Sequence, residues 1–176
     1  VLGMTGLMLD TPLTEEQRDF TETIKSSAET LLAIINDILD FSKAEVGKLK
    51  LESEEFSLQN LLGEVGDILA HQAEIKGIEL ICKCDPETPR TVRGDYGRLR
   101  QVLVNLAINA LDAMEKNGGS LRFSATSASN RLRLAVEDSG PGVPDAIKDR
   151  IFDPFFTTKD PGRGTGMGLA VSQSIM

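Results

Sequence analysis

The most regular hydrophobic spacing in this chain runs through residues 14–49. Apolar side chains recur there at alternating steps of four and three, at Ile24, Ala28, Leu31, Ile35 and Ile38. This period is typical of a coiled-coil seam, and a second stripe runs beside it at Leu32, Leu39 and Val46. The pattern predicts one long helix whose two stripes are buried in a four-helix bundle made by a dimer. A single amphipathic helix packed on its own domain is the alternative.

Polar residues mark the start of this helix. Thr14 and Gln17 have the spacing of a capping box, in which each side chain binds the backbone N–H of the other. The preceding residues 1–9 are mostly apolar and predict the end of a further helix, broken at 10–12 by Asp-Thr-Pro. Residues 1–49 are therefore expected to form a helical hairpin.

The pattern changes from residue 50 onward, where predicted strands and helices are mixed. Strands are predicted at 51–56 and 78–84, and residues 85–94, with two prolines, are expected to form a loop. A helix is expected between a cap at Ser57 and a stop at Gly77, with its apolar positions at Leu58, Leu61, Leu62, Val65, Ile68, Leu69 and Ile75. A second helix is predicted from an N-cap at Asp95 to a stop at 117–119.

Alternating apolar residues at 121–125 and 132–136 predict a hairpin across 127–130. Together these elements indicate the α/β class, as an α/β sandwich in which a mixed sheet carries helices on one face.

Composition narrows the class of protein. The chain has 176 residues and a formal net charge of −8, which argues against the basic surface of a nucleic-acid-binding protein. No apolar run is long enough to span a membrane, and residues 1–4 lack the basic start of a signal peptide. Cys82 and Cys84 alternate with Lys83 in a predicted strand and are expected in the core, a metal or redox pair being the alternative.

The helix predicted to begin at Asp95 carries polar side chains on an otherwise apolar surface. Asn105 and Asn109 lie one turn apart on one face, and Asp112 follows three residues later. Amides are costly to bury without hydrogen-bonding partners. A Mg²⁺ ion bound to a triphosphate would supply such partners, because Mg²⁺ takes oxygen ligands and shares them with substrate phosphates.

Two glycine clusters follow towards the end of the chain. Asp138 leads from a strand into the turn 139–142, where its carboxylate is placed to accept a hydrogen bond from the amine of an adenine. The second cluster, 162–168, opens directly into an apolar helix start at Leu169. Glycines let the backbone come close to a ligand, and the first N–H groups of a helix attract phosphate. One cluster therefore suits a base, and the other suits a triphosphate.

Four motifs in this order resemble those of a known family. They are Asn-x-x-x-Asn-Ala at 105–110, Asp-x-Gly-x-Gly at 138–142, Phe-x-Pro-Phe-Phe at 152–156 and Gly-x-Gly-x-Gly at 164–168. They resemble the asparagine, first glycine, phenylalanine and second glycine boxes of sensor histidine kinases, which belong to the wider Bergerat-fold (GHKL) ATPases. Residues 36–43, Asn-Asp-Ile-Leu-Asp-Phe-Ser-Lys, likewise resemble the far end of the dimerisation and histidine-phosphotransfer hairpin of these kinases.

The resemblance implies roles for individual residues. Asn109 would be the Mg²⁺ ligand, Asp138 would hold the adenine amine, and residues 152–163 would form a lid over the nucleotide. The catalytic residues would be Asn105, Asn109 and Lys159. The set expected around ATP comprises Asn109, Asp112, Asp138, Gly140, Gly142, Phe156, Thr158, Lys159, Arg163, Gly164, Thr165, Gly166, Met167, Gly168 and Leu169.

Several of these roles have a plainer alternative. Lys159 and Arg163 would neutralise phosphate charge or else be solvated loop cations. Asp112 would support the metal or else be an acid on the helix face. Phe152, Phe155 and Phe156 are expected mainly to pack the base of the lid.

The resemblance also implies an activity. The γ-phosphoryl group of ATP would pass to a histidine and then to an aspartate in the receiver domain of a response regulator. The protein would be a homodimer in the cytoplasm, with or without a membrane anchor elsewhere in the intact protein. The accepting histidine would lie outside this chain, because no His-Glu-x-Arg-Thr-Pro box occurs and the one histidine, His71, is expected at the surface.

Two domains are therefore expected. Residues 1–49 would be a truncated phosphotransfer hairpin, and residues 50–176 would be a catalytic ATP-binding domain that lacks its last strands. Such a fragment is not expected to phosphorylate itself.

Asn105 distinguishes the branches of the family. Hydrolysing members carry a glutamate at this position, where it activates water as a general base. An amide has no useful basicity, which favours transfer to an imidazole that is itself the nucleophile. A GHKL-type ATPase or protein-serine kinase and a non-enzymatic dimerisation scaffold are the alternatives.

Overall fold

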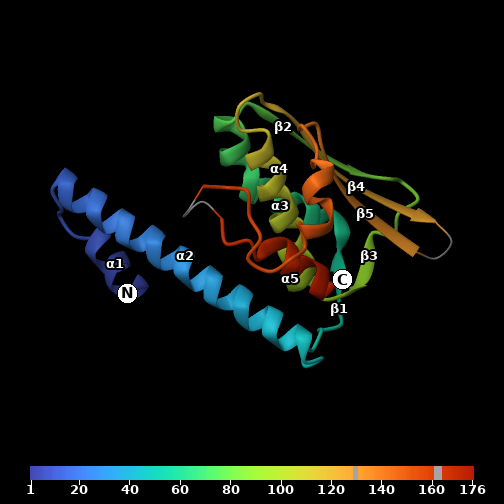
Figure 1. Ribbon diagram of the computed structural model, residues 1–176, viewed down its shortest axis with the longest axis horizontal. Helices are drawn as coiled ribbons and strands as arrows, with labels where there is room; N and C mark the ends of the chain where they lie inside the picture. The colour runs from blue at the N-terminus through green and yellow to red at the C-terminus, as the bar shows by residue number, and fades with distance from the viewer. Residues whose placement is uncertain (129–130, 161–163) are drawn as a thin grey trace.

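The computed structural model describes residues 1–128, 131–160 and 164–176. A helical arm projects from an α/β portion, and its long helix runs on beneath that portion (Figure 1). The arm consists of α1 (Leu2–Leu9) and α2 (Glu15–Glu45), which pack against each other. The predicted capping box is present, because Thr14 and Gln17 each accept the backbone N–H of the other.

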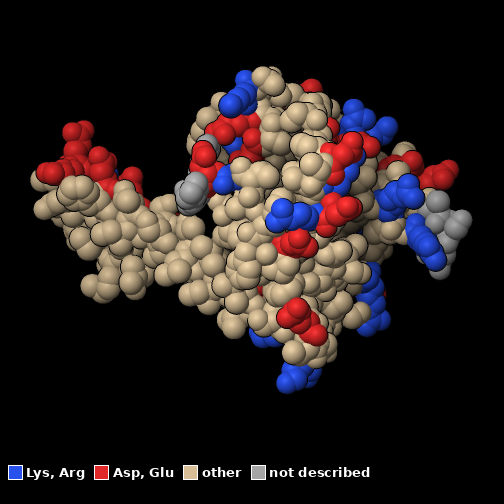
Figure 2. All heavy atoms as spheres, viewed as in Figure 1, with Lys and Arg blue, Asp and Glu red and all other residues tan. Residues whose placement is uncertain are grey.

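Both apolar stripes of α2 lie on the surface of this single chain. The exposed members are Ile24, Leu31, Leu32, Ile35, Ile38, Leu39 and Val46. Uncharged side chains cover most of the visible arm, and acidic ones gather at its outer end, where α1 joins α2 (Figure 2). The alternative of one helix with its stripes packed on its own domain does not match this exposure.

The central sheet has three strands in the order β2–β4–β5, namely β2 (Ile78–Cys84), β4 (Gly119–Ala128) and β5 (Arg131–Asp138). β2 runs parallel to β4, and β4 pairs antiparallel with β5 as the predicted hairpin. The inward face of β4 carries three fully buried residues, Leu121, Phe123 and Ala125. The predicted mixed sheet is confirmed.

Two helices cover one face of this sheet, as expected (Figure 1). They are α3 (Leu58–Ile75) and α4 (Tyr96–Ala113), and their N-caps are Ser57 and Asp95, whose side chains accept backbone N–H groups of the first turn. The core between helices and sheet includes Leu61, Val65 and Leu69 from α3, and Leu103 and Leu111 from α4.

Two apolar positions of α3 lie outside that core. Ile68 and Ile75 are exposed, at 48% and 72% of their surface. His71, between them on the same helix, is exposed as expected.

The loop expected at 85–94 contains a strand. β3 (Thr91–Gly94) pairs antiparallel with β1 (Glu54–Ser57) as a separate two-stranded sheet. The strand expected at 51–56 therefore begins three residues later, at Glu54. The prolines at 86 and 89 end the preceding strand but do not prevent pairing from Thr91 onward, because that pairing comes from a partner far away in sequence.

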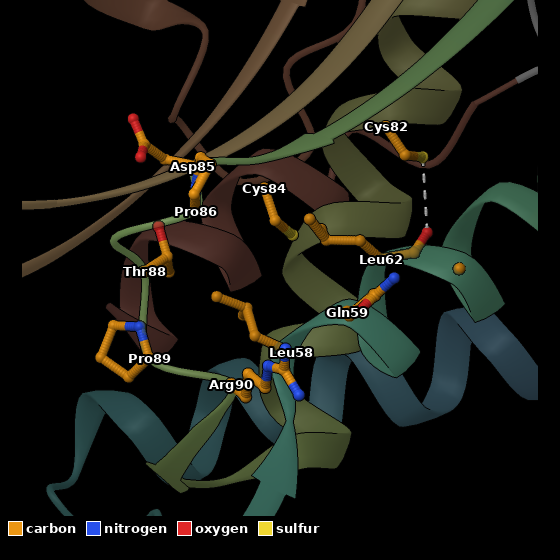
Figure 3. Close-up of a pocket in the computed structure, with 11 residues that line it drawn as sticks. Leu58, Gln59, Leu62, Cys82, Cys84, Asp85, Pro86, Thr88, Pro89 and Arg90 are labelled. Carbon is orange, nitrogen blue, oxygen red and sulfur yellow. Dashed lines mark hydrogen bonds between the residues drawn. The ribbon is translucent and has the colours of Figure 1, made fainter.

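The two cysteines are less buried than their strand position suggested. Cys82 is exposed and Cys84 is partly buried, and both line a cavity of about 500 Å³ between β2, the start of α3 and residues 85–90 (Figure 3). The Cys82 thiol contacts the carbonyl oxygen of Leu62 at 3.7 Å. Although the residue as a whole is exposed, the protein around the Cys82 thiol removes part of its water. This desolvation, with Cys84 and Asp67 nearby, raises the pKa of the thiol. The core assignment is wrong for Cys82.

The last elements are a 3₁₀ turn, η1 (Asp145–Arg150), and α5 (Gly168–Ile175). α5 contacts both α4 and α2. The arm is tied to the same region by Asp40 of α2, whose two carboxylate oxygens accept from the Arg98 guanidinium of α4. Among the described residues no helix has the length and apolarity needed to cross a membrane.

Candidate functional site

One face of α4 forms a wall of a cavity of about 600 Å³. The helical period places Asn105, Ile108, Asn109 and Ala113 on this face. The opposite face of α4 carries Leu103 and Leu111 into the core. The two asparagines predicted to share a ligand-facing side are therefore brought together in one wall.

The opposite walls come from residues 142–169. The lining residues there are Gly142, Val143, Pro144, Ile147, Ile151, Phe156, Thr157, Thr158, Lys159, Gly164, Thr165, Gly166, Gly168 and Leu169. Most of the residues expected around ATP are in this set. The cavity also has an apolar wall of Val143, Ile147 and Ile151, which the motifs did not indicate.

The arm closes a third side of the cavity, which was not expected. Thr30, Ala33 and Asp37 of α2 line it. Burial and the neighbouring charge of Asp40 raise the pKa of Asp37, against a hydrogen bond with Gln101 that lowers it. Only the folded chain brings α2 here, since no local signal links Asp37 to a site more than sixty residues away.

Lys159 connects the lid segment to α4. Its ammonium group donates to Asn109 Oδ1 at 3.1 Å and to Asp112 Oδ2 at 2.6 Å. The other oxygen of Asp112 accepts from Lys76 Nζ at 2.7 Å. Burial acts to raise the pKa of Asp112, but hydrogen bonds and charge from Lys159 and Lys76 outweigh it and leave the pKa below its usual value. Lys76 was not among the expected site residues.

The side chain of Asn105 hydrogen-bonds to α5. Its side-chain amide donates to the carbonyl oxygen of Gly168 at 3.2 Å and lies 3.5 Å from the hydroxyl of Ser172. The amide thus fastens the first turn of α5, which among the described residues has no side-chain cap. The N-terminus of α5, with its unpaired N–H groups, consequently lies at the cavity through Gly168 and Leu169.

Asp138 stands beside the cavity rather than among its described lining residues. It is exposed, and its Oδ1 accepts the backbone N–H of Gly140 at 2.9 Å. Gly140 is likewise absent from the lining, while Gly142 two residues on contributes to it. The base-binding end predicted at 138–142 is therefore adjacent to the cavity.

The second glycine turn is folded against its own lid segment. Gly166 has a φ of +67°, and a side chain there would meet the carbonyl carbon of Phe155 at 2.4 Å. Phe155 N–H donates to the Gly166 carbonyl oxygen at 3.0 Å. Glycine is thus required at 166 because the backbone there lies close to another segment of the chain. The sequence had predicted a close approach to a ligand instead.

Other predicted residues in this turn differ in placement. Met167 is 1% exposed, so its side chain belongs to the interior rather than to the cavity lining. Arg163 lies outside the described residues. Phe152 and Phe155 are exposed, at 42% and 63% of their surface, which does not match the expected packing at the lid base. Phe156 lines the cavity and lies under the Arg150 guanidinium, 4.4 Å from its ring centre.

The donor set fits a magnesium nucleotide. Asn109 Oδ1 and Asp112 Oδ2 converge on a cation, the ammonium of Lys159. Mg²⁺ prefers such oxygen ligands and takes most of the others from water and phosphate. The glycine turn and the start of α5 offer backbone N–H groups nearby. Asn109 is the residue that would hold the metal.

Fold and site together define a nucleotide-binding α/β sandwich joined to a helical hairpin. A family model described as Histidine kinase-, DNA gyrase B-, and HSP90-like ATPase matches residues 94–176. A second, described as His Kinase A (phospho-acceptor) domain, matches residues 1–47.

Known proteins agree with these matches. The histidine-protein kinase BarA of Escherichia coli K12 is 40% identical over 183 residues, which covers 100% of this chain and 20% of BarA. The crystal structure of full-length ShkA in complex with AMPPNP matches 99% of this chain and 36% of that one, with a TM-score of 0.82 and 34% identity. Histidine kinase ThkA in complex with the response regulator TrrA matches 98% of this chain and 49% of that one, with a TM-score of 0.66 and 27% identity.

The chain belongs to the sensor histidine kinase family, and it matches family models of both the phospho-acceptor domain and the ATPase domain. It spans about a fifth of the length of BarA. The ATPase family model and the AMPPNP complex of ShkA support ATP binding.

Proposed function

We propose that this chain binds ATP with Mg²⁺ in the cavity beside α4 and transfers the γ-phosphoryl group to a histidine of a phospho-acceptor helix. The imidazole nitrogen forms a bond to the γ-phosphorus as the bond to the β-phosphate oxygen breaks, and ADP leaves. An aspartate of a receiver domain then takes the phosphoryl group. The observation that carries this proposal is the convergence of Asn109, Asp112 and Lys159 beside the glycine turn at 164–168.

The residues of the site suit this chemistry. Transfer to an imidazole requires positioning and charge neutralisation more than proton abstraction. Lys159 reaches into the cavity from the lid, and the N-terminus of α5 is aimed there by Asn105. Magnesium would neutralise triphosphate charge when held by Asn109. Asp138, which is exposed, would accept a hydrogen bond from the adenine amine at the rim of the cavity.

Asn105 favours transfer over hydrolysis. A water-activating base is needed to promote attack by water. The Asn105 amide is instead committed to Gly168, and it has no useful basicity. A steady ATPase is therefore the less favoured function.

The proposed assembly is a homodimer through the hairpin, with residues 1–49 and 50–176 as its two functional units. The exposed stripes of α2 support a partner helix pair there. A receiver domain is the proposed partner for relay, which the ThkA–TrrA complex supports.

Calorimetry with ADP tests the nucleotide site. The chain should bind ADP more tightly with Mg²⁺ than without, and Asn109→Ala should weaken Mg-ADP binding by at least about tenfold. Asn60→Ala, at an exposed asparagine of α3, is the matched control and should leave affinity unchanged. Failure of the wild-type chain to bind either nucleotide would contradict the proposal.

Labelling with γ-³²P ATP tests the reaction. The chain alone should neither label itself nor release phosphate much above background. With a second chain that carries a phospho-acceptor histidine, it should label that histidine in a manner that depends on Asn109. Acid-labile label on His71, or steady phosphate release that depends on Asn109, would overturn this assignment.

A further inference from the structure

One carboxylate joins three segments that are far apart in sequence. Asp112 of α4 pairs with Lys76 at the end of α3, at 2.7 Å, and with Lys159 of the lid segment, at 2.6 Å. The side chains of Lys76, Asp112 and Lys159 are only 16%, 28% and 27% exposed. Water screens such pairs less than it screens exposed ones.

The Lys159 ammonium lies where the proposed Mg²⁺ ion would bind. It donates to Asn109 Oδ1, which is the proposed metal ligand, as well as to Asp112. A divalent cation bound to Asn109 would take over that oxygen and repel the ammonium. Asp112 is then the anchor that keeps Lys159 at the edge of the site, within reach of phosphate oxygens.

Lys76 fixes the geometry of this anchor. Its ammonium is held by Asp112 Oδ1 and lies 3.4 Å from the carbonyl oxygen of Leu111. Its backbone is fixed as well, because the turn after α3 touches the turn after α4. A side chain at Gly118 would meet the Gly77 carbonyl oxygen at 2.9 Å. Lys76 thus reserves one oxygen of Asp112 and leaves the other for Lys159.

We infer that Lys76 is a positioning residue of the nucleotide site, acting through Asp112 on Lys159. This inference rests on the proposed function, since it assumes Mg-nucleotide at Asn109. Without Lys76, Asp112 can turn both oxygens to Lys159 and draw it away from the phosphates. Lys76 would therefore support nucleotide affinity without touching the nucleotide.

A double-mutant cycle on Mg-ATP affinity tests this role. A non-hydrolysed ATP analogue is titrated with Mg²⁺ into the wild-type chain, Lys76→Met, Lys159→Met and the double variant. Lys76→Met should weaken binding about fivefold, and the same change should have less than about a twofold effect when Lys159 is already Met. Lys76→Arg should restore affinity, because it keeps the charge beside Asp112.

The controls separate the possible failures. Lys83→Met, at an exposed lysine of β2, should not change affinity. Equal weakening by Lys76→Met in both backgrounds would show a merely structural ion pair and overturn the inference while leaving the proposed function intact. If Lys76→Met does not fold, the cycle is run with Lys76→Gln, and additivity there overturns the inference equally. A wild-type chain that binds no Mg-nucleotide would overturn both.

Discussion

Asn105 and Asn109 carry the same amide one turn apart on α4, yet their surroundings give them different roles. Asn105 is committed to the α5 backbone, whereas the oxygen of Asn109 faces a lysine ammonium across the cavity. The difference follows from what lies opposite each residue, not from the residue type. At this scale, one turn of helix separates a structural amide from a candidate ligand.

Gly166 illustrates a second residue-scale constraint. Its φ of +67° is strained for any side chain, and an added Cβ would strike the Phe155 backbone. Gly166→Ala should therefore destabilise the chain by about 1–3 kcal/mol. It should also weaken nucleotide binding, because the new side chain forces the glycine turn away from the Phe155 backbone. Thermal unfolding and calorimetry on the same samples measure both effects.

Gly63→Ala is the matched control. Gly63 lies inside α3 with nothing within 4 Å of an added Cβ. Alanine there should stabilise the helix by up to about 1 kcal/mol. A Gly166→Ala protein as stable as the wild type would show that the close contact between Gly166 and the Phe155 backbone does not stabilise the chain.

At the scale of elements, the junction between α2 and α4 stands out. Asp40 pairs with Arg98 through both oxygens, and the Gln101 amide lies 3.5 Å from Asp40. Burial would raise the pKa of Asp40, but the Arg98 hydrogen bond and charge outweigh it and leave the pKa below its usual value. The junction also keeps Thr30, Ala33 and Asp37 of α2 against the nucleotide cavity.

Asp40→Asn should loosen this junction. Backbone amides of residues 33–42 should then exchange with solvent roughly five- to tenfold faster at neutral pH, as expected for the loss of about 1 kcal/mol. Asp19→Asn, at an exposed aspartate of the same helix, is the control and should not change exchange.

The same junction predicts a pH dependence. A carboxyl with a lowered pKa contributes stability above the unfolded-state pKa and loses it as pH falls through the folded-state value. The wild-type arm should therefore behave like Asp40→Asn once the pH falls well below about 4. A difference between the two proteins that stays the same at every pH across the acid range would contradict this account.

At the scale of the whole molecule, the arm carries more of the exposed large apolar side chains than the α/β portion does, among the residues that the structure describes. Leu31 and Ile35 are 58% and 45% exposed in the single chain, and they belong to the same stripe of α2 as Ile24 and Ile38, which are also exposed. A continuous exposed apolar stripe of this kind is typical of an association surface. The α/β portion, in contrast, has an apolar core buried between α3, α4 and the sheet.

The double change Leu31→Asp and Ile35→Asp should shift the protein towards monomers, because a buried unpaired carboxylate is expensive. Sedimentation velocity at several concentrations measures the change in mass. Thr23→Asp with Ser26→Asp, at exposed polar positions of α2, adds the same charge and should leave the mass unchanged. An unchanged mass for the seam variant, or a monomeric wild type, would count against the bundle.

Local patterns determined most elements of this protein. The capping box at Thr14, the caps at Ser57 and Asp95, and the β4–β5 hairpin all depend on residues close in sequence, so the sequence alone predicted them. The order of the asparagine and glycine motifs also predicted which segments surround the site. Burial of Cys82 was predicted wrongly, since periodicity says which residues share a face but not what covers it.

Tertiary structure alone decided the contacts between distant segments. β3 exists because β1 pairs with it, and Lys76 meets Lys159 only through Asp112. Asp37 reaches the cavity because α2 packs on α5 and Asp40 of α2 pairs with Arg98 of α4. Each contact joins residues more than thirty positions apart, and its free energy depends on packing that no local window contains. The sequence therefore determined the elements and the family of the site, whereas the fold decided which charged side chains from distant segments come together at the site.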